Sequence, residues 1–165
     1  MIPSQSDRVQ TFRKIVNDQD GNDTTNLLFV PVNDGGVSGG GARWSLLLVD
    51  RRVPTAPVAY HYDSVGSRNS TVAEQLAARL GSRLQPARMA RQQNGHDCGV
   101  YVVDATRALI GRLAQGERPD KEPLHLEHLI ADRPAQRLYY GLYSCGRVIR
   151  FAFRRSNPQS PLTFR

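Results

Sequence analysis

RQQNGHDCGVYVV, residues 91–103, runs from a polar turn into an apolar segment. Its Asn-Gly pair is a strong turn signal. Asp97 then stands where a helix can begin, because aspartate is a favoured N-cap residue. The apolar side chains that follow recur at roughly helical spacing as far as Leu113, and Gly116 marks a stop. The sequence therefore predicts a helix with Cys98 in its first turn.

A cysteine in the first turn of a helix lies at the positive end of the helix dipole. This position lowers the pKa of the thiol, so Cys98 is a candidate nucleophile. The alternative is a buried structural cysteine, which is the usual role of a lone cysteine in a core. Cys145, the other cysteine, forms neither a CxxC pair with Cys98 nor a zinc motif.

The same stretch resembles the catalytic-cysteine signature of the SUMO-specific cysteine protease family. That signature has a glutamine before an Asn-Gly-aromatic-Asp-Cys-Gly motif, which leads into an apolar helix. This chain matches at Gln92, Asp97 and Cys98, with His96 at the aromatic position. The resemblance implies that Cys98 is the nucleophile and that Gln92 helps to form the oxyanion hole, where an amide donor stabilises the developing charge. It also implies that Asp97 belongs to the substrate-binding residues.

Two strands upstream carry the second part of the resemblance. WSLLLVD, residues 44–50, is apolar on both faces, as in a central strand covered from both sides. VAYHYDS, residues 58–64, is the next predicted strand, and a turn region between the two predicts a hairpin.

In the family, a Tyr-x-Asp-Ser motif supplies the third catalytic residue, which implies that Asp63 orients and stabilises a catalytic imidazolium. Trp44 matches the family tryptophan that lines the tunnel for a Gly-Gly tail. The simpler interpretations are a turn-capping carboxylate for Asp63 and an ordinary core residue for Trp44.

Arg43 stands where the family has its catalytic histidine. That histidine accepts the proton of the thiol and later protonates the leaving amine. Arginine does neither, because it stays protonated at every accessible pH. Arg43 can instead form a salt bridge with Asp63, or lower the pKa of Cys98 by its charge. His61 and His96 are the candidates for a replacement base, although surface or packing roles are favoured for both.

The remaining pattern predicts strands over residues 27–32 and 83–90 and helices over 72–80 and 124–140. With the resemblance, we expect an α/β cysteine-protease fold: a central mixed sheet with helices packed on it. Residues 1–140 form the expected protease domain, partial at its amino-terminal end, because the family's Trp-Leu-x-Asp segment has no counterpart. Residues 141–165, with five arginines and no acidic residue, form an expected basic tail.

Charge and composition narrow the function classes. The chain is 39% hydrophobic and 22% charged, as in soluble globular proteins, and no apolar run approaches the length of a membrane span. Of the net charge of +7, the tail holds +5, so the other 140 residues carry 7 − 5 = +2. The tail can contact nucleic acid, but no stacking aromatics accompany the charge, so nucleic-acid binding is the weaker alternative.

The resemblance implies hydrolysis after the Gly-Gly of SUMO or a related ubiquitin-like protein. Cys98 would form a thioester that water hydrolyses, without a metal or cofactor. The alternative is a pseudoprotease that binds a ubiquitin-like protein without cleaving it, which Arg43 favours. We expect a soluble monomer, either cytoplasmic or secreted by a bacterium into a host cell, because residues 60–64 and 102–113 most resemble effector proteases of plant-associated bacteria.

Overall fold

The computed structural model describes residues 20, 25–35, 43–119 and 122–133. Within these ranges lie, in chain order, β1 (Leu27–Asn33), β2 (Trp44–Asp50), β3 (Val58–Tyr62), α2 (Ser70–Arg79), β4 (Arg83–Ala87) and α3 (Cys98–Ala114). The strands form one sheet in the order β1-β2-β3-β4, in which β3 and β4 are parallel and the other pairs antiparallel. The predicted mixed sheet with packed helices is confirmed.

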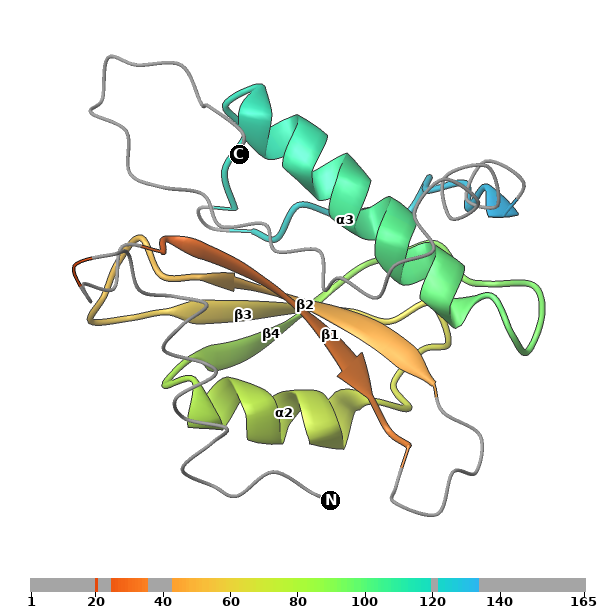
Figure 1. The fold of residues 1–165 in the computed structure, drawn as a ribbon, viewed down its shortest axis with the longest axis horizontal. Coiled ribbons are helices and arrows are strands. Elements are labelled where there is room, and N and C mark those ends of the chain that lie inside the picture. Colours follow the sequence, from red (N-terminus) through yellow and green to blue (C-terminus); the bar gives the residue numbers. More distant parts are fainter. Residues whose placement is uncertain (1–19, 21–24, 36–42, 120–121, 134–165) are drawn as a thin grey trace.

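The sheet lies between two helices, with α3 on one face and α2 on the other (Figure 1). Central strand β2 supplies buried side chains to both layers. Leu46 and Leu48 pack in the cluster that includes α3, whereas Leu47 and Val49 pack in the cluster that includes α2. All four are completely buried, and a buried side chain of this kind stabilises the fold by about 1.5–3 kcal/mol. The apolar pattern of residues 44–50 therefore reflects burial on both faces, as predicted.

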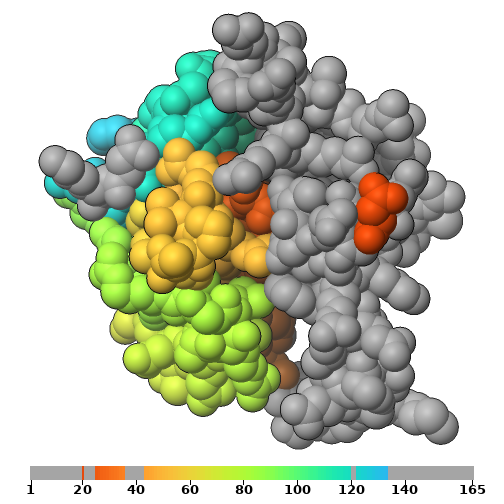
Figure 2. Space-filling view, turned by 90° about the vertical axis from the view of Figure 1, so that its left-hand side faces the viewer, coloured from red at the N-terminus to blue at the C-terminus, as the bar shows by residue number. Residues whose placement is uncertain are grey.

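Strand β1 is an edge strand, paired with β2 from Leu27 opposite Asp50 to Asn33 opposite Trp44. Pro31 is exposed there, as expected for a residue that has no N–H to donate to a ladder. The predicted β2–β3 hairpin is also present. Figure 2 shows the end of the molecule at which this hairpin turns, with the turn in gold between α3 above and residues of α2 and β4 below.

Glycines end both helices. Gly81 follows α2 with a φ of +65° and Gly116 follows α3 with a φ of +93°, a left-handed conformation that glycine adopts without strain. Helix α3 begins at Cys98, as the sequence predicted. The turn at Gly81 lets the chain return as β4, parallel to β3.

The predicted helix over residues 124–140 is wrong over residues 124–132, although Arg133 is helical. Residues 124–132 are not helical, and Leu126 instead forms a parallel bridge with Met89 beyond the end of β4. The hydroxyl of Tyr62 donates to the Leu124 carbonyl at 2.9 Å. Leu124 and Leu126 are both buried, which is the alternation of an extended segment. Residues 134–140 of that prediction, and the tail 141–165, lie outside the described residues.

No helix in the described ranges is long and apolar enough to cross a membrane. These ranges also hold no group of three or more histidine, cysteine or acidic side chains that could bind a metal ion.

The Tyr62 hydroxyl should stabilise this extended segment. Tyr62→Phe leaves the Leu124 carbonyl without its buried donor, which should lower the free energy of unfolding by about 1–3 kcal/mol in urea titrations. Tyr101→Phe is the matched control, because its hydroxyl makes a longer bond of 3.3 Å to the Arg91 carbonyl. A loss no larger for Tyr62→Phe than for Tyr101→Phe would contradict this assignment.

Candidate active site

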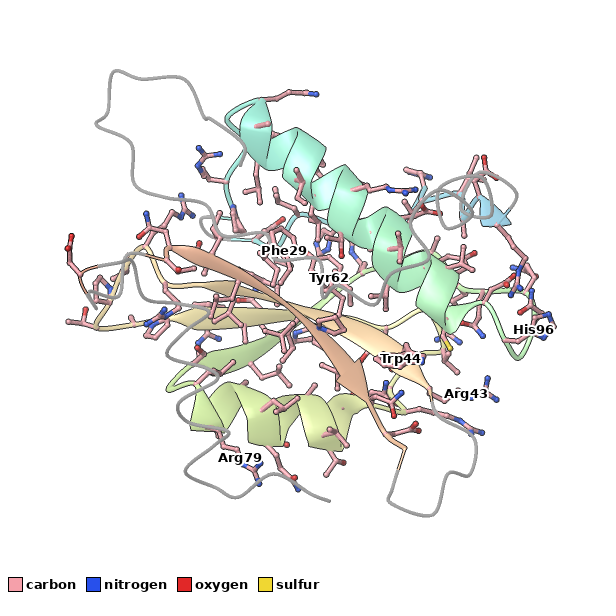
Figure 3. All side chains as sticks on the ribbon, in the orientation of Figure 1. Phe29, Arg43, Trp44, Tyr62, Arg79 and His96 are labelled. Carbon is pink, nitrogen blue, oxygen red and sulfur yellow. The ribbon has the colours of Figure 1, made fainter. Side chains whose placement is uncertain are left out.

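The candidate site lies at the end of the sheet where β2 begins beside the first turn of α3 (Figures 1 and 3). Cys98 is the first residue of α3 and is only 4% exposed. Trp44 is the first residue of β2 and is 41% exposed. A Cβ atom on Gly99 would lie 3.9 Å from Trp44 Cδ1, so the indole borders the first helical turn. The structure thus brings Trp44 and the Cys98 turn together, and Trp44 is not an ordinary core residue.

Arg43 extends from the start of β2 to the turn that precedes Cys98. Its Nη1 donates to the Gly95 carbonyl. A Cβ atom on Gly95 would lie 3.8 Å from the same nitrogen, so the guanidinium lies over this glycine. Among the residues that the structure describes, no ion pair joins Arg43 to Asp63. The salt bridge considered from the sequence is therefore replaced by a contact with the backbone of the cysteine turn.

Asp63 follows β3 and binds the turn that leads into α2. Its Oδ1 accepts from the Val65 N–H at 2.8 Å and its Oδ2 from the Asn69 N–H at 3.2 Å. The turn-capping interpretation thus describes its contacts. The neighbouring Ser64 hydroxyl donates to Gln92 Oε1 at 2.9 Å, and the Gln92 N–H donates to the Ser64 carbonyl at 3.1 Å. These bonds attach the end of β3 to the segment before Cys98.

The amide of Gln92 has a fixed orientation. Because its Oε1 accepts from Ser64, its Nε2 must lie on the other side, where it donates to the Asn94 carbonyl at 2.5 Å. An amide nitrogen carries two hydrogens, so one donor is used in the turn and one remains for a ligand. This geometry is compatible with the oxyanion role that the resemblance implies.

The turn before Cys98 is stabilised by hydrogen bonds within the turn and by a hydrogen bond from a distant residue. Asn94 Oδ1 accepts from the N–H groups of His96 and Asp97, each at 2.9 Å. Asp97 occupies the N-cap position of α3, but its side chain makes no capping hydrogen bond, which differs from the simplest expectation for an aspartate there. Its carboxylate instead accepts from Asn94 Nδ2 at 2.5 Å and from Arg133 Nε at 2.6 Å. The Asn94 bond, followed by Arg133, lowers the pKa of Asp97.

Arg133 was missed by the sequence analysis, because it stands 36 residues from Asp97 and no local pattern links them. Its Nη2 also reaches the His96 carbonyl, at 3.4 Å. The preceding N–H, of Asp132, donates to Asp104 Oδ2 on α3 at 2.9 Å. This bond places Arg133 beside the turn. Two arginines, Arg43 and Arg133, therefore bind the turn from two different segments.

His61 is not placed to act as the base for Cys98. It pairs across the sheet with Leu47, whose side chain packs in the α2 cluster, so His61 faces α2 whereas Cys98 begins the helix on the other face. It is 5% exposed, and its Nε2 lies 2.9 Å from Ser45 Oγ. Burial lowers the pKa of His61, and the charge of Asp63 offsets part of this effect.

His96 lies on the exposed turn before Cys98, and Figure 3 shows it on the outer side of this turn, away from the sheet. The described structure therefore gives neither histidine the place of the missing family histidine.

Buried His61 should make the fold sensitive to mild acid. Its folded-state pKa is below the ordinary value of 6.5, so the unfolded chain binds the proton more readily between these two values. The free energy of unfolding that depends on neutral His61 has its full value above pH 6.5 and decreases as the pH drops below 6.5. We expect the urea midpoint to fall between about pH 7 and pH 5, and His61→Gln to reduce that fall. The exposed control His128→Gln should not, and equal pH profiles for the two variants would refute the assignment.

Arg133 should hold the turn closed. An exposed ion pair contributes about 0.2–1 kcal/mol, so Arg133→Ala should speed amide hydrogen exchange in residues 94–98 by up to ~5-fold. Arg88→Ala is a matched control, because it removes another surface ion pair, with Glu127. Unchanged exchange in Arg133→Ala, or an equal effect of Arg88→Ala on the same residues, would argue against this role.

The chain is similar to known proteases in sequence and in structure, although no family model matches it. The NEDD8-specific protease 2 of Schizosaccharomyces pombe is 30% identical over 114 residues, 64% of this chain and 27% of that protein. The sentrin-specific protease 8 of Rattus norvegicus is 36% identical over 110 residues, 61% of this chain and 48% of that protein. The chain thus spans less than half the length of these relatives.

Two solved structures share the fold. The structure of the Xanthomonas campestris effector protein XopD bound to ubiquitin has a TM-score of 0.71 and 26% identity, covering 86% of this chain and 71% of that one. A structure of Xanthomonas XopD that addresses the substrate specificity of ubiquitin-like protein proteases has a TM-score of 0.63 and 27% identity, covering 84% and 77%. By sequence and by fold, the chain is similar to SUMO- and ubiquitin-like-protein-specific cysteine proteases.

Proposed function

We propose that this chain binds the Gly-Gly tail of SUMO or a related ubiquitin-like protein, and that Cys98 is its nucleophile. The observation that carries the proposal is the position of Cys98 at the start of α3, with Gln92 fixed just before it and Trp44 beside the same turn. A thiol at a helix N-terminus is stabilised as thiolate, and the neighbouring amide can donate to an oxyanion.

In the proposed reaction, Cys98 Sγ attacks the carbonyl carbon at the end of the tail. The negative charge passes to the carbonyl oxygen, where the remaining N–H of Gln92 Nε2 stabilises it. Collapse of the intermediate expels the amine and leaves a thioester, which water hydrolyses. Trp44, at the edge of the first helical turn, packs against the tail. Asp97 shapes the substrate side of the turn, where Arg133 holds its carboxylate.

The proton transfers of this reaction should be slow, because Arg43 replaces the family's histidine. A cysteine protease needs a base for the thiol proton and an acid for the leaving amine. Arg43 stands where the family has a histidine and stays protonated, so both protons must be exchanged with solvent. Its guanidinium is also bonded to the Gly95 carbonyl. Loss of general acid–base catalysis typically slows a reaction by ~10²–10⁴-fold. We therefore propose slow turnover by the native chain.

The Arg43 contact also favours the second candidate function, binding of a ubiquitin-like protein without cleavage. The turn that would border the tail is held by two arginines whether or not chemistry follows. Nucleic-acid binding is less supported, because arginines and acidic residues nearly balance over the described ranges. The similarity to a bacterial effector protein supports the proposal that this protein is secreted into a host cell.

Arg43→His should restore turnover of a SUMO-type or NEDD8-type precursor. An imidazole supplies both proton transfers, and Asp63 is already at the end of β3 to orient it. We expect cleavage, followed by gel and mass spectrometry, to rise by at least ~10²-fold over the native chain.

Two controls make this experiment specific. Cys98→Ala added to Arg43→His must abolish cleavage. Arg91→His introduces a histidine elsewhere on the segment before Cys98 and should leave the rate at the native level. Native turnover as fast as that of Arg43→His would show that another group is the base. Binding of the ubiquitin-like protein by both chains, with cleavage by neither, would establish the second candidate function.

A further inference from the structure

Asn69 is a completely buried polar residue at the junction of three site elements. It occupies the N-cap position of α2, where asparagine ordinarily accepts a hydrogen bond from the helix backbone. Its side chain makes no such bond. Instead, Nδ2 donates to the Arg43 carbonyl at 3.1 Å and to Ser45 Oγ at 3.1 Å. Its side chain thus serves β2 rather than its own helix.

The same residue binds Asp63 through its backbone, because the Asn69 N–H donates to Asp63 Oδ2 at 3.2 Å. Asn69 therefore contacts position 43 with its side chain and Asp63 with its main chain. In the proposed function, position 43 is the place where the family has its catalytic base, and Asp63 is the carboxylate that would orient such a base. No other hydrogen-bonded residue in the described ranges joins both of them.

The orientation of the Asn69 amide follows from its partners. A backbone carbonyl can only accept, so the nitrogen, not the oxygen, must face Arg43. Ser45 Oγ accepts the second amide hydrogen, which leaves its own hydroxyl hydrogen to donate to His61 Nε2 at 2.9 Å. A buried chain of hydrogen bonds thus fixes the amide from the side of the sheet opposite α3.

This arrangement is not the one that stability alone would favour. Asn69 Oδ1 is buried and has no hydrogen-bond partner among the described residues. A buried acceptor without a hydrogen bond lowers the stability of the fold. A serine at this N-cap position would bond to the helix backbone and would leave no buried acceptor unpaired. Asparagine, unlike serine, has two N–H donors on a side chain that is long enough to reach the Arg43 carbonyl and Ser45 Oγ.

We infer that Asn69 is a positioning residue that holds the backbone at position 43, just before β2, in a fixed place relative to the turn that Asp63 caps. The inference rests on the proposed function, since it concerns the position at which the family has its catalytic histidine. In the native chain, the same bond holds the backbone from which Arg43 extends to Gly95. With histidine at position 43, it would hold the imidazole within reach of Asp63.

The test uses the reactivity of Cys98 rather than cleavage, so that no substrate is needed. The full chain carrying Arg43→His is treated with iodoacetamide across pH 4–10, and alkylation of the Cys98 peptide is followed by mass spectrometry. A cysteine paired with an imidazolium should react with a midpoint below ~7.5, against ~8.5 for an ordinary thiol. Asn69→Ala in this background should raise the midpoint by at least ~1 pH unit, because the charged partner is no longer held in place.

Three further chains complete the design. Asn69→Ser keeps a good N-cap but cannot span to the Arg43 carbonyl, so it should raise the midpoint as Asn69→Ala does. Ser70→Ala, at the next residue, should leave the midpoint of the Arg43→His chain unchanged. Asn69→Ala in the native Arg43 background should change the Cys98 midpoint less than it does with histidine present.

Each outcome decides the inference. A lower melting temperature with an unchanged Cys98 midpoint in both Asn69 variants would make Asn69 a merely structural residue. Failure of both variants to fold would do the same, as would an Arg43→His midpoint that stays at the ordinary value. If the midpoints move as expected but no ubiquitin-like protein is bound or cleaved, the proposed function fails while the positioning role of Asn69 stands.

Discussion

Strand β2 is buried on both faces, and the position of every site element depends on this burial. The side chains of its consecutive leucines point alternately to the two faces of the sheet, so each face needs a covering layer. Helices α3 and α2 supply those layers. The first residue of β2, Trp44, then borders the first turn of α3. A residue just before β2 and a residue at the start of α3 are thereby held at the same end of the molecule. The packing of the core thus brings the elements of the candidate site to one end of the sheet.

Polar contacts then determine what the site can do. The segment before Cys98 is bonded to the end of β3 through Ser64, to the start of β2 through Arg43 and to the chain after α3 through Arg133. In the proposed function, a turn held from three sides serves as a preorganised binding surface, which lowers the entropic cost of fixing a substrate tail. In the proposed reaction, only the proton transfers lack a residue of suitable chemistry, because Arg43 stands where the family has its histidine. The proposed function therefore separates binding of the tail from acid–base catalysis.

The sequence predicted those features that local patterns encode. Residues 44–50 and 58–62 were predicted as strands because their apolar character and turn signals are local, and the start of α3 was predicted from the turn before it. The non-helical segment at 124–132 was mistaken for a helix, although the alternation of Leu124 and Leu126 was the signal against it. Such a segment gains its hydrogen bonds from distant residues, here Arg88 and Tyr62, which a local pattern does not show.

Long-range polar partners were the other part that the sequence could not supply. The resemblance placed Cys98, Gln92 and Asp63 in one site, and the structure attaches the end of β3 to the cysteine segment through Ser64. The roles of Arg133 and Asn69 depend on contacts between residues 26 to 36 positions apart, and arginine or asparagine alone carries no signal for them. The partner of Arg43 was also unexpected, because a charged side chain near Asp63 suggests an ion pair rather than a bond to a backbone carbonyl.

The most direct measurement is covalent capture of the native chain by SUMO, NEDD8 and ubiquitin that each carry an electrophile in place of the last carboxylate. Capture needs tail binding and a thiolate, but not the histidine that protonates a leaving amine. If Cys98 is a nucleophile beside a tail-binding site, at least one of the three probes should form an adduct at Cys98, identified by peptide mass spectrometry and absent in Cys98→Ala. An adduct at Cys145 alone, or none with any of the three probes, would contradict the proposed site.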